Sequence, residues 1–383
     1  MGPLEGICII ELQGIGPGPF CAMMLADMGA EVIRVDRPGA RGGLPREPRY
    51  DTLARGRRSL RIDLKQPDGA ETLLRVTEQA DGLIEGFRPG VIERLGLGPD
   101  VLLERNPRLV IGRMTGWGQE GPIAHTAGHD INYIALAGAL FNIGRKGAPP
   151  VPPLNLVGDF GGGGMFLAFG MVCGILNARQ TGAGQVVDSA MVDGAAVLCA
   201  AMYGLLASGR LEEGRQTGVV NGGSHFYDAF ECADGEFVSI ASIEPQFYAE
   251  LCKLMGLDPE DFGEQMNSER WPEQRAKIAA LFRTRTRDEW CDVLQQSDAC
   301  FAPVLRMAEA IEHPQNRVRK TFVEVDGVAQ PAPAPRFSTT PPEISRPPAQ
   351  PGEHSDEILA DFGFSSDEIG ALHESGAVAG RDA

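Results

Sequence analysis

The sequence has few of the features that mark disulfide-bonded, zinc-binding or membrane-spanning proteins. Its 383 residues include eight cysteines, and no two of them form a C-x-x-C pair. Most of these cysteines lie inside apolar runs, so we expect reduced core residues rather than a disulfide framework or a metal site. The longest apolar run, Met165 to Leu176, is shorter than the roughly 20 residues that a membrane helix needs. We therefore expect no membrane partner and no metal.

Positive charge is also scarce. Lysine and arginine number 35 against 52 aspartates and glutamates, which gives a formal net charge of −17. Such an acidic chain is a poor general binder of nucleic acid or anionic membrane, so neither is expected as a partner. The sequence opens without a basic and apolar leader and ends without a peroxisomal tripeptide, and we expect a cytoplasmic protein.

The remaining pattern predicts an α/β protein with two domains. An apolar run at 7–12, a Gly/Pro turn, a helical run at 20–28 and a strand at 31–36 form a strand, turn, helix, strand unit, which is typical of a parallel sheet. Further strands are expected at 82–85 and 109–113, and helices at 68–79, 165–177 and 190–207.

A change of composition follows. Residues 208–224 are glycine-rich and polar, as in a linker, and the next segment predicts a smaller α+β unit. Its strands are expected at 226–231 and 236–241, and its helices at 246–255, 273–282 and 288–296. Eight prolines between 331 and 351 predict an extended segment, which two helices follow at 355–362 and 366–374.

A glycine-rich turn stands where dinucleotide-binding folds hold their phosphate loop. The turn reads Gly14-Ile15-Gly16-Pro17-Gly18-Pro19, and Asp36 follows about twenty residues later. Pro19 replaces the third glycine of the usual motif, and proline supplies no amide donor. Three interpretations stay open here: a tight connection without a ligand, an NAD(P) site, and a site for a different nucleotide.

A basic segment favours a nucleotide. Residues 34–65 contain ten basic and four acidic side chains, a local charge of +6 within an acidic chain. A solvated surface is the alternative, but phosphate groups would be held well by such a cluster. Arg88 follows another predicted strand and is a second candidate for a phosphate contact.

Three ionisable residues at predicted helix starts are candidates for proton transfer: His129, Asp159 and Glu244. His129 lies in a glycine turn before an apolar helix, whose positive end would keep the imidazole neutral and ready to accept a proton. Asp159 is followed by four glycines that would let a bound group approach the backbone, and amides at this helix start could hold an oxyanion.

Each of these residues also has a structural interpretation, as a helix cap, a core contact or a first-turn acid. Together they suit a site in which two groups approach one carbon from opposite faces. Metal ligation is not expected, because no His-x-x-His or paired cysteine spacing supports it.

At these residues the sequence resembles the α-methylacyl-CoA racemases of the family III CoA-transferase (CaiB/BaiF) group. The resemblance covers essentially the whole chain. It rests on the stretches Gly16 to Met23, Val35 to Gly39, Asp63 to Pro67, Gly128 to Tyr133, Asn155 to Gly163 and Ile243 to Tyr248.

The resemblance implies that His129 and Asp159 are the acid/base pair of a racemase and that Glu244 assists His129. It also implies that coenzyme A, as part of the substrate, is held by Arg37, by Arg61, Ile62, Asp63 and Leu64, and by Arg88. The residues implied to line the thioester are Gly128, Asp130, Ile131, Asn132 and Tyr133. No cofactor is implied.

The implied fold is an interlocked homodimer with a Rossmann-like large domain and a smaller α+β domain. We place the large domain at 1–190 and 330–383, the linkers at 191–224 and 316–329, and the small domain at 225–315. One departure from close racemases is Ser224-His225, which stands where they have a small apolar pair. If that loop borders the acyl pocket, the preferred acyl chain or the reaction changes with it.

The resulting hypothesis is a cofactor-free 1,1-proton transfer that interconverts (R)- and (S)-2-methylacyl-CoA through an enolate. The alternative is CoA transfer between carboxylic acids, with Asp159 as the nucleophile. A non-enzymatic acyl-CoA-binding protein is a third possibility.

Overall fold

The computed structural model describes residues 2–39 and 47–381. The chain divides into two compact units, each of which is described here by itself. Unit 1 comprises Met1–Ala137, Leu154–Leu198 and Val318–Ala383, and unit 2 comprises Gly138–Pro153 and Cys199–Arg317. The predicted domain boundaries differ in detail, because the contacts assign 191–198 and 318–329 to unit 1 and 138–153 to unit 2.

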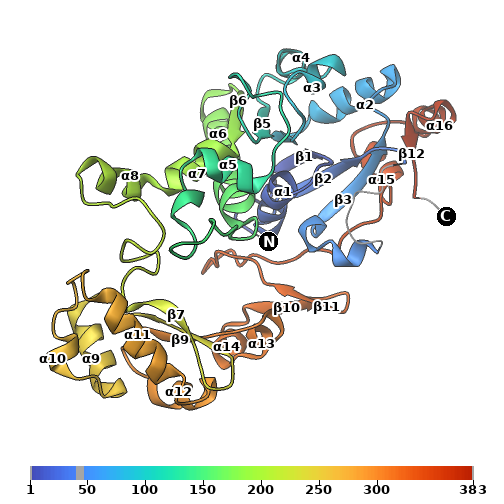
Figure 1. The fold of residues 1–383 in the computed structure, drawn as a ribbon. Coiled ribbons are helices and arrows are strands. Elements are labelled where there is room, and N and C mark those ends of the chain that lie inside the picture. The colour runs from blue at the N-terminus through green and yellow to red at the C-terminus, as the bar shows by residue number, and fades with distance from the viewer. Residues whose placement is uncertain (1, 40–46, 382–383) are drawn as a thin grey trace. The chain divides into compact units, whose positions relative to one another are not determined.

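The centre of unit 1 is a seven-stranded sheet with the order β12-β3-β2-β1-β4-β5-β6 (Figure 1). All neighbours from β3 to β6 pair in parallel, and only the edge pair between β12 and β3 is antiparallel. Without β12 the order is 3-2-1-4-5-6, that of a Rossmann sheet, which confirms the predicted fold class. The strands are β1 Cys8–Leu12, β2 Glu31–Asp36, β3 Arg57–Ile62, β4 Gly82–Glu85, β5 Val110–Thr115, β6 Gln185–Ala190 and β12 Val378–Ala379.

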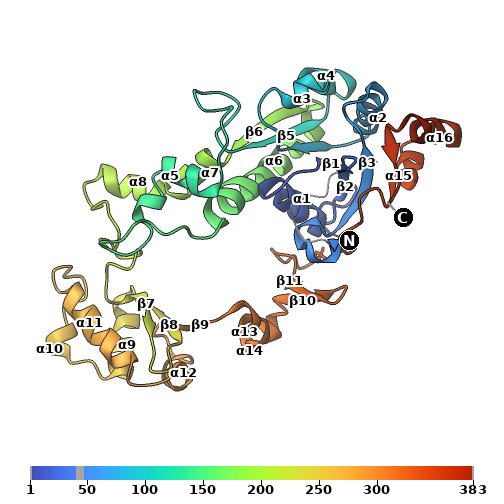
Figure 2. The same ribbon diagram turned by 45° about the vertical axis from the view of Figure 1, so that its right-hand side comes forward.

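Helices cover both faces of this sheet. Ile9 and Ile10 of β1 are both fully buried, but Ile9 packs in a cluster with α1 and α6 and Ile10 in a cluster with α2 and α15. Figures 1 and 2 show α1 and α6 together on one face. Burial on both sides explains why strands such as β1 and β4 are mostly apolar. The helices of unit 1 are α1 Pro17–Asp27, α2 Pro67–Thr77, α3 Val91–Arg94, α4 Pro99–Arg105, α5 Asp130–Leu136, α6 Phe166–Thr181, α7 Met191–Leu198, α15 Ser355–Asp361 and α16 Ser366–Ser375.

Several predicted elements are confirmed, but two of the six parallel strands were missed. The strands expected at 31–36 and 82–85 are β2 and β4. The sequence reading did not find β3 or β6. Four of the six residues of β3 are charged or polar, so its pattern did not indicate a strand, although all but Arg61 are buried.

The expected helix at 190–207 is wrong as a single element. Ala190 is the last residue of β6, and the helical part is divided at Cys199 into α7 and α8 Ala200–Ala207. Helix α7 belongs to unit 1, where its Gly194 lies against the backbone of Gly162 in the π-helix, whereas α8 belongs to unit 2. The apolar sequence on both sides of Cys199 carried no signal of this division.

A π-helix, Leu156–Met165, continues directly into α6. Together they form a 26-residue segment that is long and apolar enough for a membrane span by length and composition alone. One side of α6, which includes Leu167, Met171 and Ile175, is buried against the sheet. This packing is that of a core helix in an α/β unit.

The C-terminal part of unit 1 returns to the sheet. A hairpin of β10 Phe322–Val325 and β11 Val328–Pro331 precedes the proline-rich segment, which contains no helix, as predicted. The backbone amide of His354 then donates to the carbonyl of Ser59, and α15 packs on β3. The predicted helices at 355–362 and 366–374 are α15 and α16.

Unit 2 contains a three-stranded antiparallel sheet with helices packed around an aromatic core. Its strands are β7 Tyr227–Glu231, β8 Phe237–Ala241 and β9 Phe301–Val304. Its helices are α8, α9 Pro245–Met255, α10 Pro259–Phe262, α11 Trp271–Phe282, α12 Arg287–Leu294 and α13 Met307–Glu312, and α14 Pro314–Arg319 crosses into unit 1. The core includes Phe226, Tyr248 and Trp271.

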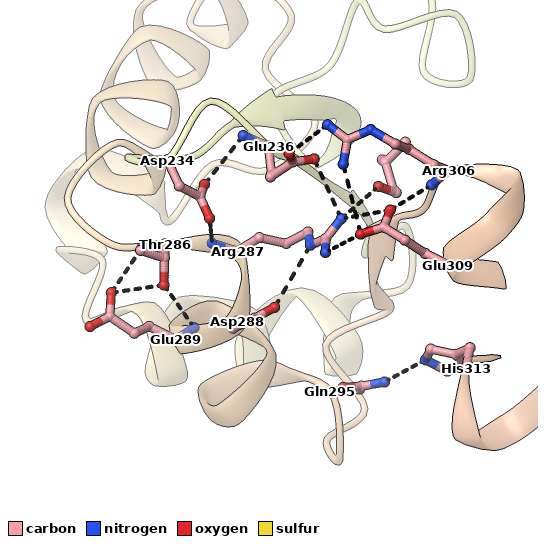
Figure 3. Close-up of polar contacts among 11 residues, drawn as sticks. Asp234, Glu236, Thr286, Arg287, Asp288, Glu289, Gln295, Arg306, Glu309 and His313 are labelled. Atoms are coloured by element: carbon pink, nitrogen blue, oxygen red, sulfur yellow. Dashed lines mark hydrogen bonds and ion pairs between the residues drawn. The ribbon is translucent and has the colours of Figure 1, made fainter.

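An ion-pair network joins three parts of unit 2 (Figure 3). Arg287 at the start of α12 contacts Glu309 of α13 at 2.7 Å and Glu236 at 3.5 Å, and Arg306 contacts Glu236 at 2.6 Å. The guanidinium of Arg287 and the backbone amide of Arg306 lower the pKa of Glu309 to about 2. The network therefore stays charged at neutral pH and fastens α13 to α12 and to the turn before β8.

Candidate active site

The site lies at the carboxyl edge of the sheet in unit 1. In an open sheet of this order, the connections after β1 and β4 leave in opposite directions and open a crevice for a ligand. The Gly14 to Pro19 turn follows β1, Arg88 follows β4, and the segment with His129 follows β5. These residues, far apart in the sequence, reach the same edge because parallel strands end there together.

Asp159 lies in the π-helix and faces the turn after β1. A Cβ added to Gly16 would be 3.3 Å from Oδ2 of Asp159, so the carboxylate lies against the backbone at the start of α1. The Asn155 side chain donates to the same oxygen at 3.2 Å. Gly16 has φ 70° and ψ −117°, a conformation that a residue with a side chain adopts only with strain.

The pKa of Asp159 responds to burial and to its polar and charged neighbours. Burial is the largest cause of a raised pKa of the Asp159 carboxyl, and the hydrogen bond from Asn155 opposes it. The charge of Asp130 raises this pKa further and the charge of His129 lowers it. A larger fraction of Asp159 is thus protonated near neutral pH than for an ordinary aspartate, which suits a group that both gives and takes a proton.

His129 is the residue immediately before α5, and its imidazole is exposed. Its backbone amide donates to the Asn132 side chain at 3.0 Å, which fixes the start of the helix. Tyr133 donates a hydrogen bond to the carbonyl of Gly128 and packs edge-on against Trp117. A Cβ on Gly128 would be 2.8 Å from the Tyr133 ring, so this contact requires glycine.

Asp130 connects the two candidate acid/base residues. Its Oδ2 accepts the amides of Gly158 at 2.6 Å and Asp159 at 2.7 Å. The structure therefore brings His129 and Asp159 together at one site. It also corrects the expectation that amides beside Asp159 hold an oxyanion, because the amides of 158 and 159 are already bonded to Asp130 and that of Phe160 to the Asn155 carbonyl.

The four glycines after Phe160 serve packing rather than access for a ligand. A Cβ on Gly162 would be 2.6 Å from the amide nitrogen of Ala195 in α7, and one on Gly164 would be 2.7 Å from the Phe20 ring in α1. Added Cβ atoms on Gly161 and Gly163 would likewise meet neighbouring atoms at 3 Å or less. The glycine run allows α1 and α7 to approach the π-helix closely and so fixes the backbone that carries Asp159.

The basic segment is largely neutralised within the fold. Three buried arginines contact carboxylates from other parts of the chain: Arg55 contacts Asp27, Arg57 contacts Glu11, and Arg58 contacts Glu31, Glu357 and Asp361. The half-buried Arg34 contacts Asp36 in its own strand. These four arginines are therefore already paired with carboxylates, and phosphate binding by the rest of the segment remains a prediction. Arg41 and Arg46 of this segment lie outside the described residues.

The predicted coenzyme A residues occupy different environments. Arg37 and Arg88 are exposed after β2 and β4, and Arg61, at the end of β3, also donates to the carbonyl of Gly380 at 3.3 Å. Ile62 is fully buried in the core, so its side chain faces away from any ligand. Asp63 accepts bonds from Lys65 and Gln66, and Leu64 packs against the core. Their contacts with coenzyme A remain predictions.

Glu244 belongs to unit 2, where it is exposed and stands immediately before α9. Its predicted action on His129 remains a prediction. Ser224 and His225, the departure noted in the sequence, are both completely buried. His225 bonds to the Tyr248 hydroxyl at 2.7 Å, and burial lowers the pKa of His225 to about 4, so its ring is a neutral part of the core of unit 2.

Sequence reasoning missed the roles of Asn155 and Gly16 at the site. Both lie in the motifs that were singled out, but only the fold places them against Asp159. Asp130 was expected to line the thioester, whereas its side chain is buried beneath the two segments.

The chain matches the family model CoA-transferase family III over residues 4–355. It is 46% identical to alpha-methylacyl-CoA racemase of Mus musculus and 45% identical to that of Homo sapiens, in each case over 97% of this chain and 96% of the relative. Among solved structures, a CAIB/BAIF family protein from Brucella suis matches with a TM-score of 0.79 and 25% identity, covering 94% of this chain and 99% of that one.

The packing of the π-helix can be tested through Gly194 of α7. A Cβ there would overlap the backbone of Gly162, so Gly194→Ala should destabilise the fold by about 1–3 kcal/mol or more in thermal or denaturant unfolding. Gly370→Ala in α16 is the matched control, because a Cβ there meets no atom within 4 Å. It should stabilise the helix by about 0.5–1 kcal/mol. Equal effects of the two changes would contradict the packing account.

Proposed function

The chain belongs to CoA-transferase family III, and from this membership we propose that it is an α-methylacyl-CoA racemase that interconverts (R)- and (S)-2-methylacyl-CoA thioesters. The observation that carries the proposal is the bond from the Asp159 amide to the side chain of Asp130, because Asp130 directly follows His129 in the chain and so keeps the two residues close. The relatives named alpha-methylacyl-CoA racemase, which match nearly the whole chain, support the same activity.

The proposed reaction is a 1,1-proton transfer. The thioester carbonyl acidifies the α-carbon, and either neutral His129 or ionised Asp159 accepts the α-proton. The electron pair of the C–H bond moves into the carbonyl and gives an enolate. The other residue, in its protonated form, then donates a proton to the opposite face of the same carbon. The raised pKa of Asp159 supports its action as the acid for one hand of substrate and as the base for the other.

Coenzyme A is proposed to bind as part of the substrate along the carboxyl ends of β2, β3 and β4. Arg37, the segment Arg61 to Leu64 and Arg88 stand at these strand ends, and arginine suits phosphate groups. Glu244 is proposed to assist His129, and the Gly128 to Tyr133 segment to border the thioester. The scheme requires no cofactor. We also place the enzyme in the cytoplasm, which agrees with its eight free cysteines.

A CoA-transferase activity is the second candidate, because the matched family carries that description and an aspartate carboxylate can act as the nucleophile. Transfer does not require an acid/base group on a second face of the carbon. The presence of His129 beside Asp159 therefore favours the racemase.

The two activities separate in one experiment. A single enantiomer of a 2-methylacyl-CoA is incubated with the enzyme in deuterated water, with and without an added carboxylate. We expect deuterium at the α-carbon and loss of optical purity without the carboxylate, and neither with the double variant His129→Ala, Asp159→Ala. CoA appearing on the added carboxylate without α-deuterium would contradict the racemase proposal.

The proposed assembly is an interlocked homodimer. Phe169, Val172 and Leu176 of α6 form an apolar stripe with Met165, the last residue of the π-helix; Phe169 is 71% and Leu176 57% exposed. Their spacing of three and four residues puts them on one face, and contiguous exposed apolar surface of this kind marks an interaction site. We propose that a second copy of the chain covers the stripe.

If a second copy covers the stripe, charged side chains placed within it should weaken the dimer. In analytical ultracentrifugation the parent should sediment with the mass of two chains, whereas the double variant Phe169→Asp, Leu176→Asp should shift toward one chain. Asn177→Asp adds charge on the same helix at an exposed position turned about 100° from Leu176 and should stay dimeric. A parent of single-chain mass would overturn the dimer.

A further inference from the structure

The carboxylate of Asp130 joins the start of α5, which follows His129, to the π-helix that carries Asp159. Asp130 is the first residue of α5, directly after His129, and is only 5% exposed. Its Oδ2 accepts the amides of Gly158 and Asp159 from the π-helix at 2.6 and 2.7 Å. The first amides of a helix have no partner within the helix, so this carboxylate caps the π-helix from a neighbouring element.

The glycine at 158 is explained by the same contact. A Cβ added to Gly158 would be 2.6 Å from Oδ2 and 2.9 Å from Cγ of Asp130. Only a residue without a side chain lets both amides reach one carboxylate oxygen. Asp130 directly follows His129, and its carboxylate accepts the amide of Asp159. This bond fixes the spacing between His129 and Asp159.

We propose that Asp130 is a positioning residue for the proton transfer, which holds Asp159 in register with His129 and also acts on Asp159 through its charge. The inference rests on the proposed function. Hydrogen bonding alone does not require a carboxylate here, because a single oxygen accepts both amides. The second oxygen, Oδ1, is buried without a hydrogen-bond partner among the described residues. Burying a charge costs free energy unless the charge is paired or fully hydrogen-bonded, and an asparagine could make the same two bonds without that cost.

The charge of Asp130 affects the protonation of the neighbouring Asp159 carboxyl. The charged and titratable groups that act on this carboxyl or on the adjacent Tyr133 are His129 and Asp130 from the α5 segment and Arg88 from the loop after β4. Among them, Asp130 is the negative neighbour of Asp159, and like charges favour protonation. Its charge therefore increases the share of Asp159 that can donate a proton.

The test compares Asp130→Asn and Asp130→Ala by the pH dependence of α-proton exchange. The asparagine keeps the acceptor but removes the charge, so the limb of the kcat/KM profile that reports Asp159 should move to lower pH while turnover at the optimum stays within about tenfold. The alanine removes the cap and should reduce kcat by about 100-fold, as for a misplaced catalytic group. An unmoved limb in Asp130→Asn, or full activity in Asp130→Ala, would overturn the proposal.

Asp27→Asn is the matched control. Asp27 is 2% exposed and bonds to Arg55, and it lies at the far end of α1, about 15 Å from Gly16 along the helix. It should lower the melting temperature without moving the limb. A limb that moved equally in Asp27→Asn would show a general effect of destabilisation and would overturn the role of Asp130.

A second variant covers the case in which Asp130→Ala does not fold. Gly158→Ala keeps Asp130 but places a Cβ against its Oδ2, and it should reduce kcat. An unchanged kcat in a folded Gly158→Ala variant would overturn the proposal. If the parent transfers CoA and exchanges no α-proton, the racemase proposal fails. The Asp130 proposal is then tested in the transfer reaction, where Asp159 is the nucleophile. The limb of the kcat/KM profile that reports Asp159 should again move to lower pH in Asp130→Asn.

Discussion

The bond between the Asp130 carboxylate and the amides of Gly158 and Asp159 is the interaction on which the site depends. The sheet brings the ends of β1, β4 and β5 to one edge, but strand order alone places backbone segments only approximately. The carboxylate joins the α5 segment to the π-helix within hydrogen-bond distance, and the glycines at 161–164 let α1 and α7 pack against that helix. The positions of His129 and Asp159 follow from these two constraints together.

A further constraint on unit 1 is the pairing of buried arginines. Arg55 lies just before β3, Arg57 and Arg58 are the first two residues of β3, and each contacts a carboxylate that is distant in sequence. Arg57 also donates to the carbonyl of Pro19 in the first turn of α1, which links this network to the backbone beside Asp159. Removing one partner of such a pair leaves an uncompensated buried charge, so these pairs hold the fold more than they serve a ligand.

The predictable part of the molecule is the part with local signals. The strands at 31–36 and 82–85 are apolar runs bounded by turns, and His129, Asp159 and Glu244 stand beside glycines or proline at helix starts. Strand β3 could not be recognised, because Arg57 and Arg58 look exposed until Glu11 and Asp361 are brought to them by the fold. The bond between Asp130 and Asp159 could not be predicted either, because the two residues are far apart in the sequence. The glycine-bordered helix starts suggested that His129 and Asp159 share a site, and the family resemblance implied their roles as an acid/base pair.

The central claim is that His129 and Asp159 act on opposite faces of one carbon. The most direct measurement is α-proton exchange in deuterated water with each pure enantiomer of a 2-methylacyl-CoA, using His129→Ala and Asp159→Asn separately. The account predicts that each variant loses racemisation but still exchanges the proton of one enantiomer, with retained configuration, and that the two variants favour opposite enantiomers. Variants that both exchange the same enantiomer, or a single variant that still racemises at the parent rate, would contradict it.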